Sequence, residues 1–96
     1  MTNVVCICGS MKFAEAMQFA AVAETLAGNI VVMPFVFKTS GLSNEEHKAL
    51  DDLHFEKIDM SYEILVVAIN GYVGPSTRNE ISYAAAVGKK VRWWEP

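Results

Sequence analysis

The chain has 96 residues, of which 52% are hydrophobic and 20% are charged, and its formal net charge is −3. This length predicts a single domain over residues 1–96, and the negative charge argues against binding to nucleic-acid polymers, because their phosphates attract basic surfaces. A domain this small cannot bury so much apolar surface alone, so we predict a homodimer or a higher homo-oligomer. No secretory signal precedes Val4, and no apolar run approaches the roughly 20 residues that span a bilayer. These features predict a cytoplasmic protein without a membrane partner.

The first third of the chain predicts a strand, a helix and a second strand. Residues 3–8 form a short apolar run rich in β-branched side chains, which is typical of a strand buried on both faces. Apolar residues then recur at helical spacing over 11–27, and Gly28 ends that helix. A second strand is predicted at 30–35, where Pro34 places the strand end near the rim of the sheet.

The remaining segments continue the same alternation of helices and strands. A loop at 36–43 leads into a helix that Ser43 or Asn44 caps and that runs to about Met60. A strand follows at 63–69, and then a loop at 70–75. The last elements are a helix at 76–87, which Gly88 ends, and a strand at 91–94.

The order of elements predicts a doubly wound α/β fold of the flavodoxin or Rossmann-like kind. Each crossover is long enough for a helix, and right-handed crossovers then give a parallel sheet with helices on both faces. We expect four strands in the order 2-1-3-4, with the switch point between the first and third strands. Ligands of such folds bind at the carboxyl ends of the strands, where this chain has loops at 9–12 and 70–76.

The first of these loops is suited to a phosphate group. Gly9 lets the backbone approach a ligand, Ser10 offers a hydroxyl group, and Lys12 supplies a positive charge at the start of a helix. An equally good interpretation from this segment alone is a plain turn with Ser10 as the N-cap of the helix.

The second loop leads into Thr77-Arg78-Asn79-Glu80, which has the form of a capping box. In that interpretation Glu80 only bonds back to the start of its helix. The predicted sheet, however, places this helix start beside Gly9, so Glu80 would face the ligand site. The helix terminus and Arg78 would keep the carboxylate ionised, as a nucleophile requires.

Three polar residues lie on one stripe of the middle helix. His47, Asp51 and His54 are spaced by four and three residues, which is compatible with a metal site but more typical of a solvated helix face. We predict no metal and no cofactor here. His54 is instead a candidate acid–base group, because an imidazole titrates near neutral pH, and Asp59 is the competing candidate.

The two cysteines and the aromatic residues give weaker signals. Cys6 and Cys8 stand two apart on one predicted strand, which is a poor geometry for a disulfide, so we interpret both as buried small hydrophobic residues in a reducing compartment. Tyr72 is a candidate for stacking on a base. For Trp93 and Trp94, packing in the core or in an interface is the default expectation.

Three segments together make the chain resemble the short nucleoside 2-deoxyribosyltransferase-like proteins of bacteria and phages. They are Ile-Cys-Gly-Ser-Met-Lys-Phe at 7–13, His-Phe-Glu-Lys-Ile-Asp at 54–59, and Gly-Tyr-Val-Gly-Pro-Ser-Thr-Arg-Asn-Glu-Ile-Ser-Tyr-Ala at 71–84. The resemblance spans nearly the whole chain, and the third segment is its most specific part. This superfamily also includes deoxynucleoside-monophosphate N-glycohydrolases.

The resemblance implies an N-glycosidase or a base-exchanging transferase that acts on a nucleoside or its 5′-monophosphate. Glu80 would attack the anomeric carbon, and Ser10, Lys12 and Ser76 would hold a 5′-phosphate. It also implies a dimer whose subunits share the active site. The predicted catalytic residues are therefore Glu80, His54 and Asp59, and the predicted substrate- or phosphate-binding residues are Gly9, Ser10, Lys12, Tyr72, Ser76, Thr77 and Arg78.

The sequence departs from the family pattern at three positions. His54 occupies the place of an aspartate that assists the leaving base, Tyr62 stands where a further aspartate is usual, and Gly74 replaces a polar residue before the glutamate. Because of these departures, a module that senses a nucleotide without turning it over is the alternative hypothesis. Transfer and hydrolysis also both stay open.

Overall fold

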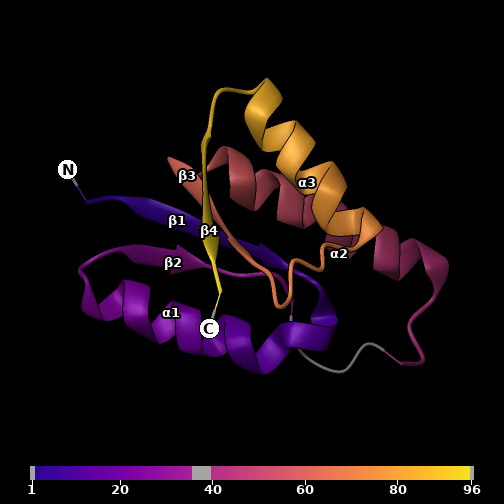
Figure 1. Ribbon diagram of the computed structural model, residues 1–96. Helices are drawn as coiled ribbons and strands as arrows, with labels where there is room; N and C mark the ends of the chain where they lie inside the picture. Colours follow the sequence, from indigo (N-terminus) through magenta and orange to yellow (C-terminus); the bar gives the residue numbers. More distant parts are fainter. Residues whose placement is uncertain (1, 36–39, 96) are drawn as a thin grey trace.

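A computed structural model of the protein describes residues 2–35 and 40–95. Its centre is a four-stranded parallel sheet in the order β2-β1-β3-β4 (Figure 1). The strands are β1 (Val4–Gly9), β2 (Ile30–Val32), β3 (Glu63–Val67) and β4 (Lys90–Trp94). The predicted α/β class and the 2-1-3-4 order are confirmed.

Three α-helices connect the strands: α1 (Ala14–Leu26), α2 (Asn44–Asp59) and α3 (Pro75–Ala86). A 3-10 turn at Met11–Phe13 precedes α1, so the helix predicted at 11–27 has an irregular first turn. Of the two caps predicted for α2, Ser43 is the N-cap, and it forms a complete capping box with Glu46.

The prolines account for two differences at element ends. The strand predicted at 30–35 ends at Val32, because Pro34 has no N–H to donate to a neighbouring strand. The helix predicted from Ser76 begins at Pro75, which is favoured as a first helical residue. The predicted loop at 36–43 includes residues 36–39, which lie outside the described part of the chain.

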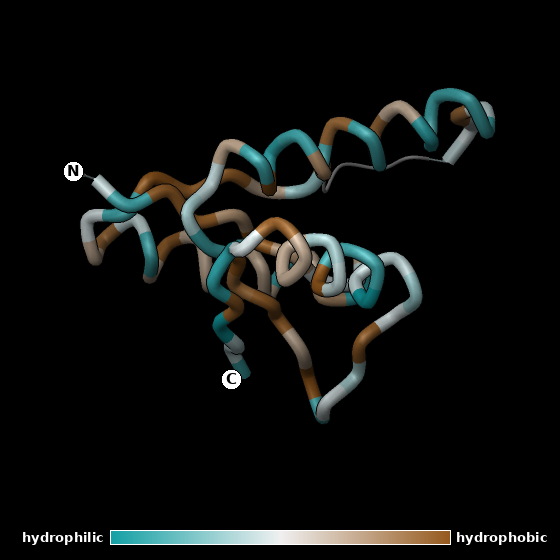
Figure 2. Tube along the Cα trace, turned by 90° about the horizontal axis from the view of Figure 1, so that it is seen from above, coloured by the Kyte–Doolittle hydropathy of each residue, from teal (hydrophilic) through white to brown (hydrophobic). Residues whose placement is uncertain are grey.

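The two faces of the sheet carry separate layers of core. Side chains alternate along the strands, so Val5 and Ile7 face α1, whereas Cys6 and Cys8 face α2 and α3 (Figures 1 and 2). Figure 2 shows the hydrophobic strand segments enclosed between these helices. Because β1 and β3 are paired along their length and covered on both faces, their carboxyl ends are held rigidly side by side.

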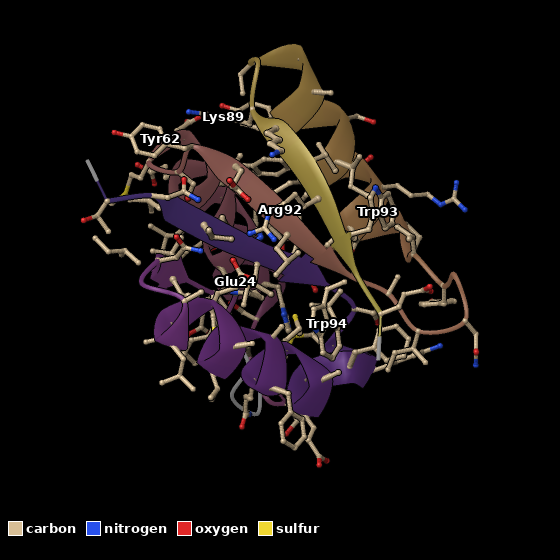
Figure 3. The ribbon with its side chains drawn as sticks, turned by 60° about the vertical axis from the view of Figure 1, so that its left-hand side comes forward. Glu24, Tyr62, Lys89, Arg92, Trp93 and Trp94 are labelled. Carbon is tan, nitrogen blue, oxygen red and sulfur yellow. The ribbon has the colours of Figure 1, made fainter. Side chains whose placement is uncertain are left out.

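A charged cluster joins the two sides of the molecule near the start of β3. Arg92 of β4 binds Glu24 of α1 at 2.5 Å and also donates to Glu63, which accepts a second hydrogen bond from Asn3 at 2.9 Å (Figure 3). Burial opposes the charge of Glu63, but the bonds from Arg92 and Asn3 outweigh it and lower the pKa of this carboxyl. Trp94 packs against the core on the α1 side.

Several large apolar side chains remain on the surface of the single chain. On α1, Phe19 is 64% exposed and Leu26 is 83% exposed. The homo-oligomer stays a prediction. Within residues 2–35 and 40–95, no helix has the length and apolar character needed to cross a membrane.

Candidate functional site

A cavity of about 340 Å³ lies where β1 and β3 end, within the size range of small-molecule sites. Its lining comes from the loop after β1, the segment after β2, the first three turns of α2, and the loop after β3 together with the start of α3. The lining residues are Gly9, Ser10, Met11, Pro34, Phe35, His47, Leu50, Asp51, His54, Tyr72, Gly74, Pro75, Ser76, Thr77 and Glu80. The cavity therefore occupies the switch point of the sheet.

Most of the predicted site residues meet in this cavity, but three do not. Those that line it are Gly9, Ser10, His54, Tyr72, Ser76, Thr77 and Glu80. Lys12, Asp59 and Arg78 are absent from the lining. The Nζ of Lys12 lies 4.4 Å from the centre of the ring of Tyr72, which does line the cavity.

The glycine at the end of β1 packs closely against β3 and α1. A Cβ atom at Gly9 would lie 3.0 Å from the carbonyl oxygen of Val67 and 3.1 Å from the sulfur of Met17. The next residue, Ser10, caps the 3-10 turn by accepting a hydrogen bond from the Lys12 N–H at 3.3 Å. The capping role foreseen for Ser10 is thus present, and the same residue also lines the cavity.

The start of α3 differs from the predicted capping box. Gly74 is the N-cap, Pro75 is the first helical residue, and no side chain caps this end. The N–H groups of Ser76 and Thr77 therefore have no partner within the helix, and both residues line the cavity. Such a helix start favours an anionic ligand, because its free N–H groups and the helix dipole carry partial positive charge.

Because α3 begins at Pro75, Glu80 lies in the second turn and is not a capping residue. Its side chain is only 14% exposed, and its Oε1 is 3.4 Å from Nε2 of His54 on α2. The Arg78 side chain donates a hydrogen bond to the carbonyl of Val73 at 3.3 Å. The partner that the structure gives Glu80 is His54.

His54 is the most buried polar residue of the cavity wall apart from Thr77, with 5% of its surface exposed. Its Nε2 also lies 3.4 Å from the sulfur of Cys8. Burial lowers the pKa of His54, but the hydrogen bond and the negative charge of Glu80 contribute to a net rise above the ordinary value. Its Nδ1 is buried without a hydrogen-bond partner among the described residues.

Asp59, the competing acid–base candidate, points away from the cavity. It is the last residue of α2, and its carboxylate accepts a hydrogen bond of 2.6 Å from the Tyr83 hydroxyl. Its backbone carbonyl accepts a further bond from Lys89. These contacts give Asp59 a structural role between α2 and α3.

Two polar residues of the cavity, His47 and Asp51, are not among the predicted catalytic and binding residues. Their spacing from His54 was the available signal, because residues three, four and seven apart share one face of a helix. In the structure this stripe forms a wall of the cavity, so part of it faces a potential ligand.

Comparisons with known proteins support the fold. No protein-family model and no curated protein sequence matches the chain. Among solved structures, the chain is similar to a 2-deoxyribosyltransferase of the psychrotolerant bacterium Bacillus psychrosaccharolyticus, with a TM-score of 0.80 and 16% sequence identity. The match covers 97% of this chain and 72% of that protein. The chain therefore shares the fold of a 2-deoxyribosyltransferase.

Proposed function

We propose that the protein cleaves or exchanges the N-glycosidic bond of a nucleoside or its 5′-monophosphate, with Glu80 as the nucleophile. The observation that carries the proposal is the Glu80 carboxylate in the cavity, 3.4 Å from His54 and free of any capping role. The similarity to a 2-deoxyribosyltransferase supports a glycosyl-transfer reaction on this fold.

In this mechanism Glu80 attacks the anomeric carbon as the bond to the base breaks. The bonding pair leaves with the base, the sugar passes through an oxocarbenium-like state, and a glycosyl ester forms on the carboxylate. A water molecule or a second base then displaces Glu80 and restores it. The first outcome is hydrolysis and the second is transfer.

The contact between His54 and Glu80 suggests a positioning role for the histidine. A base displaced by Glu80 leaves from the opposite face of the sugar, so a group that touches Glu80 lies on the wrong side to protonate it. The imidazole instead orients the carboxylate for attack. We assign protonation of the leaving base to Asp51, which lines the cavity one turn before His54 on α2.

A 5′-phosphate would bind in the part of the cavity near the start of α3. Ser10, Ser76 and Thr77 all line the cavity, so the Ser10 hydroxyl and the N–H groups at the uncapped start of α3 are the donors that we assign to the phosphate. Tyr72 offers a ring face, and Lys12 already lies against it. The substrate class is therefore a nucleoside or its monophosphate, with the phosphate neutralised mainly by backbone N–H groups.

Base release from a panel of nucleosides and 5′-monophosphates tests the proposal. Glu80→Gln should lower turnover by about a thousandfold or more while binding of the intact nucleotide survives. Asp59→Asn is the matched carboxylate control, and it should retain turnover. A Glu80→Gln variant that is as active as the wild type would end the nucleophile proposal. Tight binding of one nucleotide without any base release would instead favour a sensor.

The two assignments on α2 have their own matched pair of variants. Asp51→Asn should reduce base release, and the loss should be smaller for substrates whose base leaves easily. Asp52→Asn is the control, because Asp52 is bound to Lys48 at 2.7 Å on the exposed side of the same helix. Equal losses in both variants would refute the role given to Asp51.

A further inference from the structure

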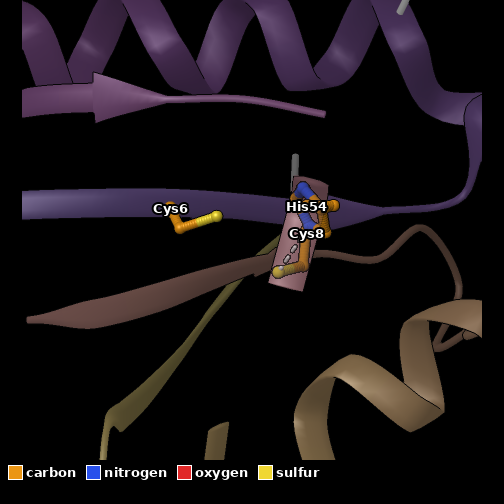
Figure 4. A group of neighbouring side chains, drawn as sticks. All are labelled: Cys6, Cys8 and His54. Atoms are coloured by element: carbon orange, nitrogen blue, oxygen red, sulfur yellow. Dashed lines mark hydrogen bonds between the residues drawn. The ribbon is translucent and has the colours of Figure 1, made fainter. Parts of the chain in front are cut away.

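Two cysteines and a histidine meet beneath the cavity, on the side of the sheet that α2 covers (Figure 4). Cys6 and Cys8 alternate with Val5 and Ile7, so both thiols project from β1 toward α2. His54 comes from α2, and the two cysteine sulfurs and a ring nitrogen of His54 are all within 4.8 Å of one another. All three residues are buried, and both cysteines are free thiols.

We propose that Cys6, Cys8 and His54 bind one Zn²⁺ ion, with Glu80 as the fourth ligand. Zinc in proteins is usually tetrahedral and takes thiolate, imidazole and carboxylate ligands. Ligand atoms at ordinary Zn–N and Zn–O distances lie about 3.4 Å apart around a tetrahedral ion, and an N–S pair about 3.6 Å apart. The His54–Glu80 and His54–Cys8 separations are both 3.4 Å. These two pairs therefore already have the spacing of a tetrahedral site, whereas the Cys6 sulfur, which lies within 4.8 Å of the other two ligand atoms, has to move closer when an ion binds.

Zinc binding here is an exchange of protons for metal, with no change of oxidation state. Zinc binds cysteine as the thiolate, so a proton on the sulfur of Cys6 or Cys8 leaves when the ion binds. Zinc binding at this cluster should therefore release protons. The ion reaches the cluster through the cavity, because His54 and Glu80 line it.

The bound ion would also control the site above it. Zinc occupies His54 Nε2 and a Glu80 oxygen, so the carboxylate is no longer free to attack a sugar. This consequence rests on the proposed function, whereas zinc binding itself does not. Base release should therefore be full in EDTA and suppressed by one equivalent of Zn²⁺.

Titration of the reduced, metal-free full chain with Co²⁺ tests the proposal directly. We expect one Co²⁺ per chain, with the visible spectrum of a tetrahedral site and a near-ultraviolet thiolate-to-cobalt charge-transfer band, which Zn²⁺ then displaces. Cys8→Ala and His54→Gln should weaken binding at least tenfold. His47→Gln is the matched control, because the chain has only these two histidines, and it should retain the spectrum.

Two further measurements keep the outcome decisive. Thermal melts without metal show whether each variant is folded, and proton release into a weakly buffered solution is read from the wild type alone. A wild type without a charge-transfer band at one equivalent, or with no proton release, overturns the zinc site. So does a folded Cys8→Ala variant with an unchanged spectrum. Base release in EDTA without a cobalt spectrum removes only the zinc site, and a cobalt spectrum without base release removes only the enzyme.

Discussion

The contact between His54 and Glu80 makes protein stability depend on pH in a predictable way. Glu80→Gln removes the negative charge that faces a buried imidazole. In the folded protein the pKa of His54 is raised above its unfolded value, and Glu80 is the partner that opposes the effect of burial. A group with a raised folded pKa stabilises the protein fully below its unfolded pKa of about 6.5. This stabilisation is lost as the pH rises through the folded pKa.

The size of the effect follows from burial and distance. The side chains of His54 and Glu80 are 6% and 14% exposed, so solvent screens them only weakly. Hydrogen bonds to charged groups contribute about 1.5–3 kcal/mol, but the 3.4 Å separation is longer than the usual limit of about 3.2 Å. We therefore expect Glu80→Gln to lower the free energy of unfolding by about 1–2 kcal/mol near pH 5.5. The difference should shrink toward pH 8.5, because the stabilisation is lost as the pH rises through the folded pKa of His54.

Urea unfolding in EDTA at about half-unit steps between those pH values measures this difference. EDTA is needed so that no metal competes for the same side chains. Glu56→Gln is the control, because Glu56 is an exposed glutamate of the same helix as His54. Its difference from the wild type should stay flat with pH. A Glu80→Gln difference that is constant, or that grows toward pH 8.5, would refute the ion pair.

Three further predictions concern the frame of the site. Gly9→Ala should lower the free energy of unfolding in urea by about 1–3 kcal/mol, because its Cβ would lie 3.0 Å from the backbone of Val67. Gly74→Ala should lower it by much less, because the nearest atom to its Cβ is a side-chain atom at 3.5 Å. Glu63→Gln should destabilise the protein by about 1–2 kcal/mol at neutral pH. This difference should shrink below about pH 4, because a carboxyl with a lowered pKa loses its stabilising effect as the pH falls. Lys12→Ala should weaken the binding of a deoxynucleoside 5′-monophosphate severalfold in calorimetry and leave the binding of the nucleoside unchanged. Equal losses for both ligands would mean that Lys12 acts only through its contact with Tyr72.

The fold was predictable because it follows from rules that act along the chain. Apolar runs gave the four strands, and crossovers of helical length with fixed handedness left one strand order to expect. Element ends were less predictable, because they depend on single backbone groups. Pro34 shortened a strand, and Pro75 moved the start of α3.

The place of the site was predictable, but the partners of its side chains were not. The topological rule located the two loops, whereas the contact of Glu80 with His54 depends on how α2 packs beside α3. Helix phase would have separated the candidates on α2: Asp51 is three residues from His54 and shares its face, while Asp59 is five residues away and does not. In the structure Asp51 lines the cavity and Asp59 binds Tyr83.

The start of α3 explains why one segment supported two opposite interpretations of Glu80. With Thr77 as the N-cap, Glu80 would be the third helical residue and would bond back to the cap. With Gly74 as the N-cap, the helix begins three residues earlier, and the carboxylate is turned to the cavity and to His54. A glutamine would serve the first role as well as a glutamate. Only the second role needs the negative charge, so Glu80→Gln separates a functional glutamate from a structural one.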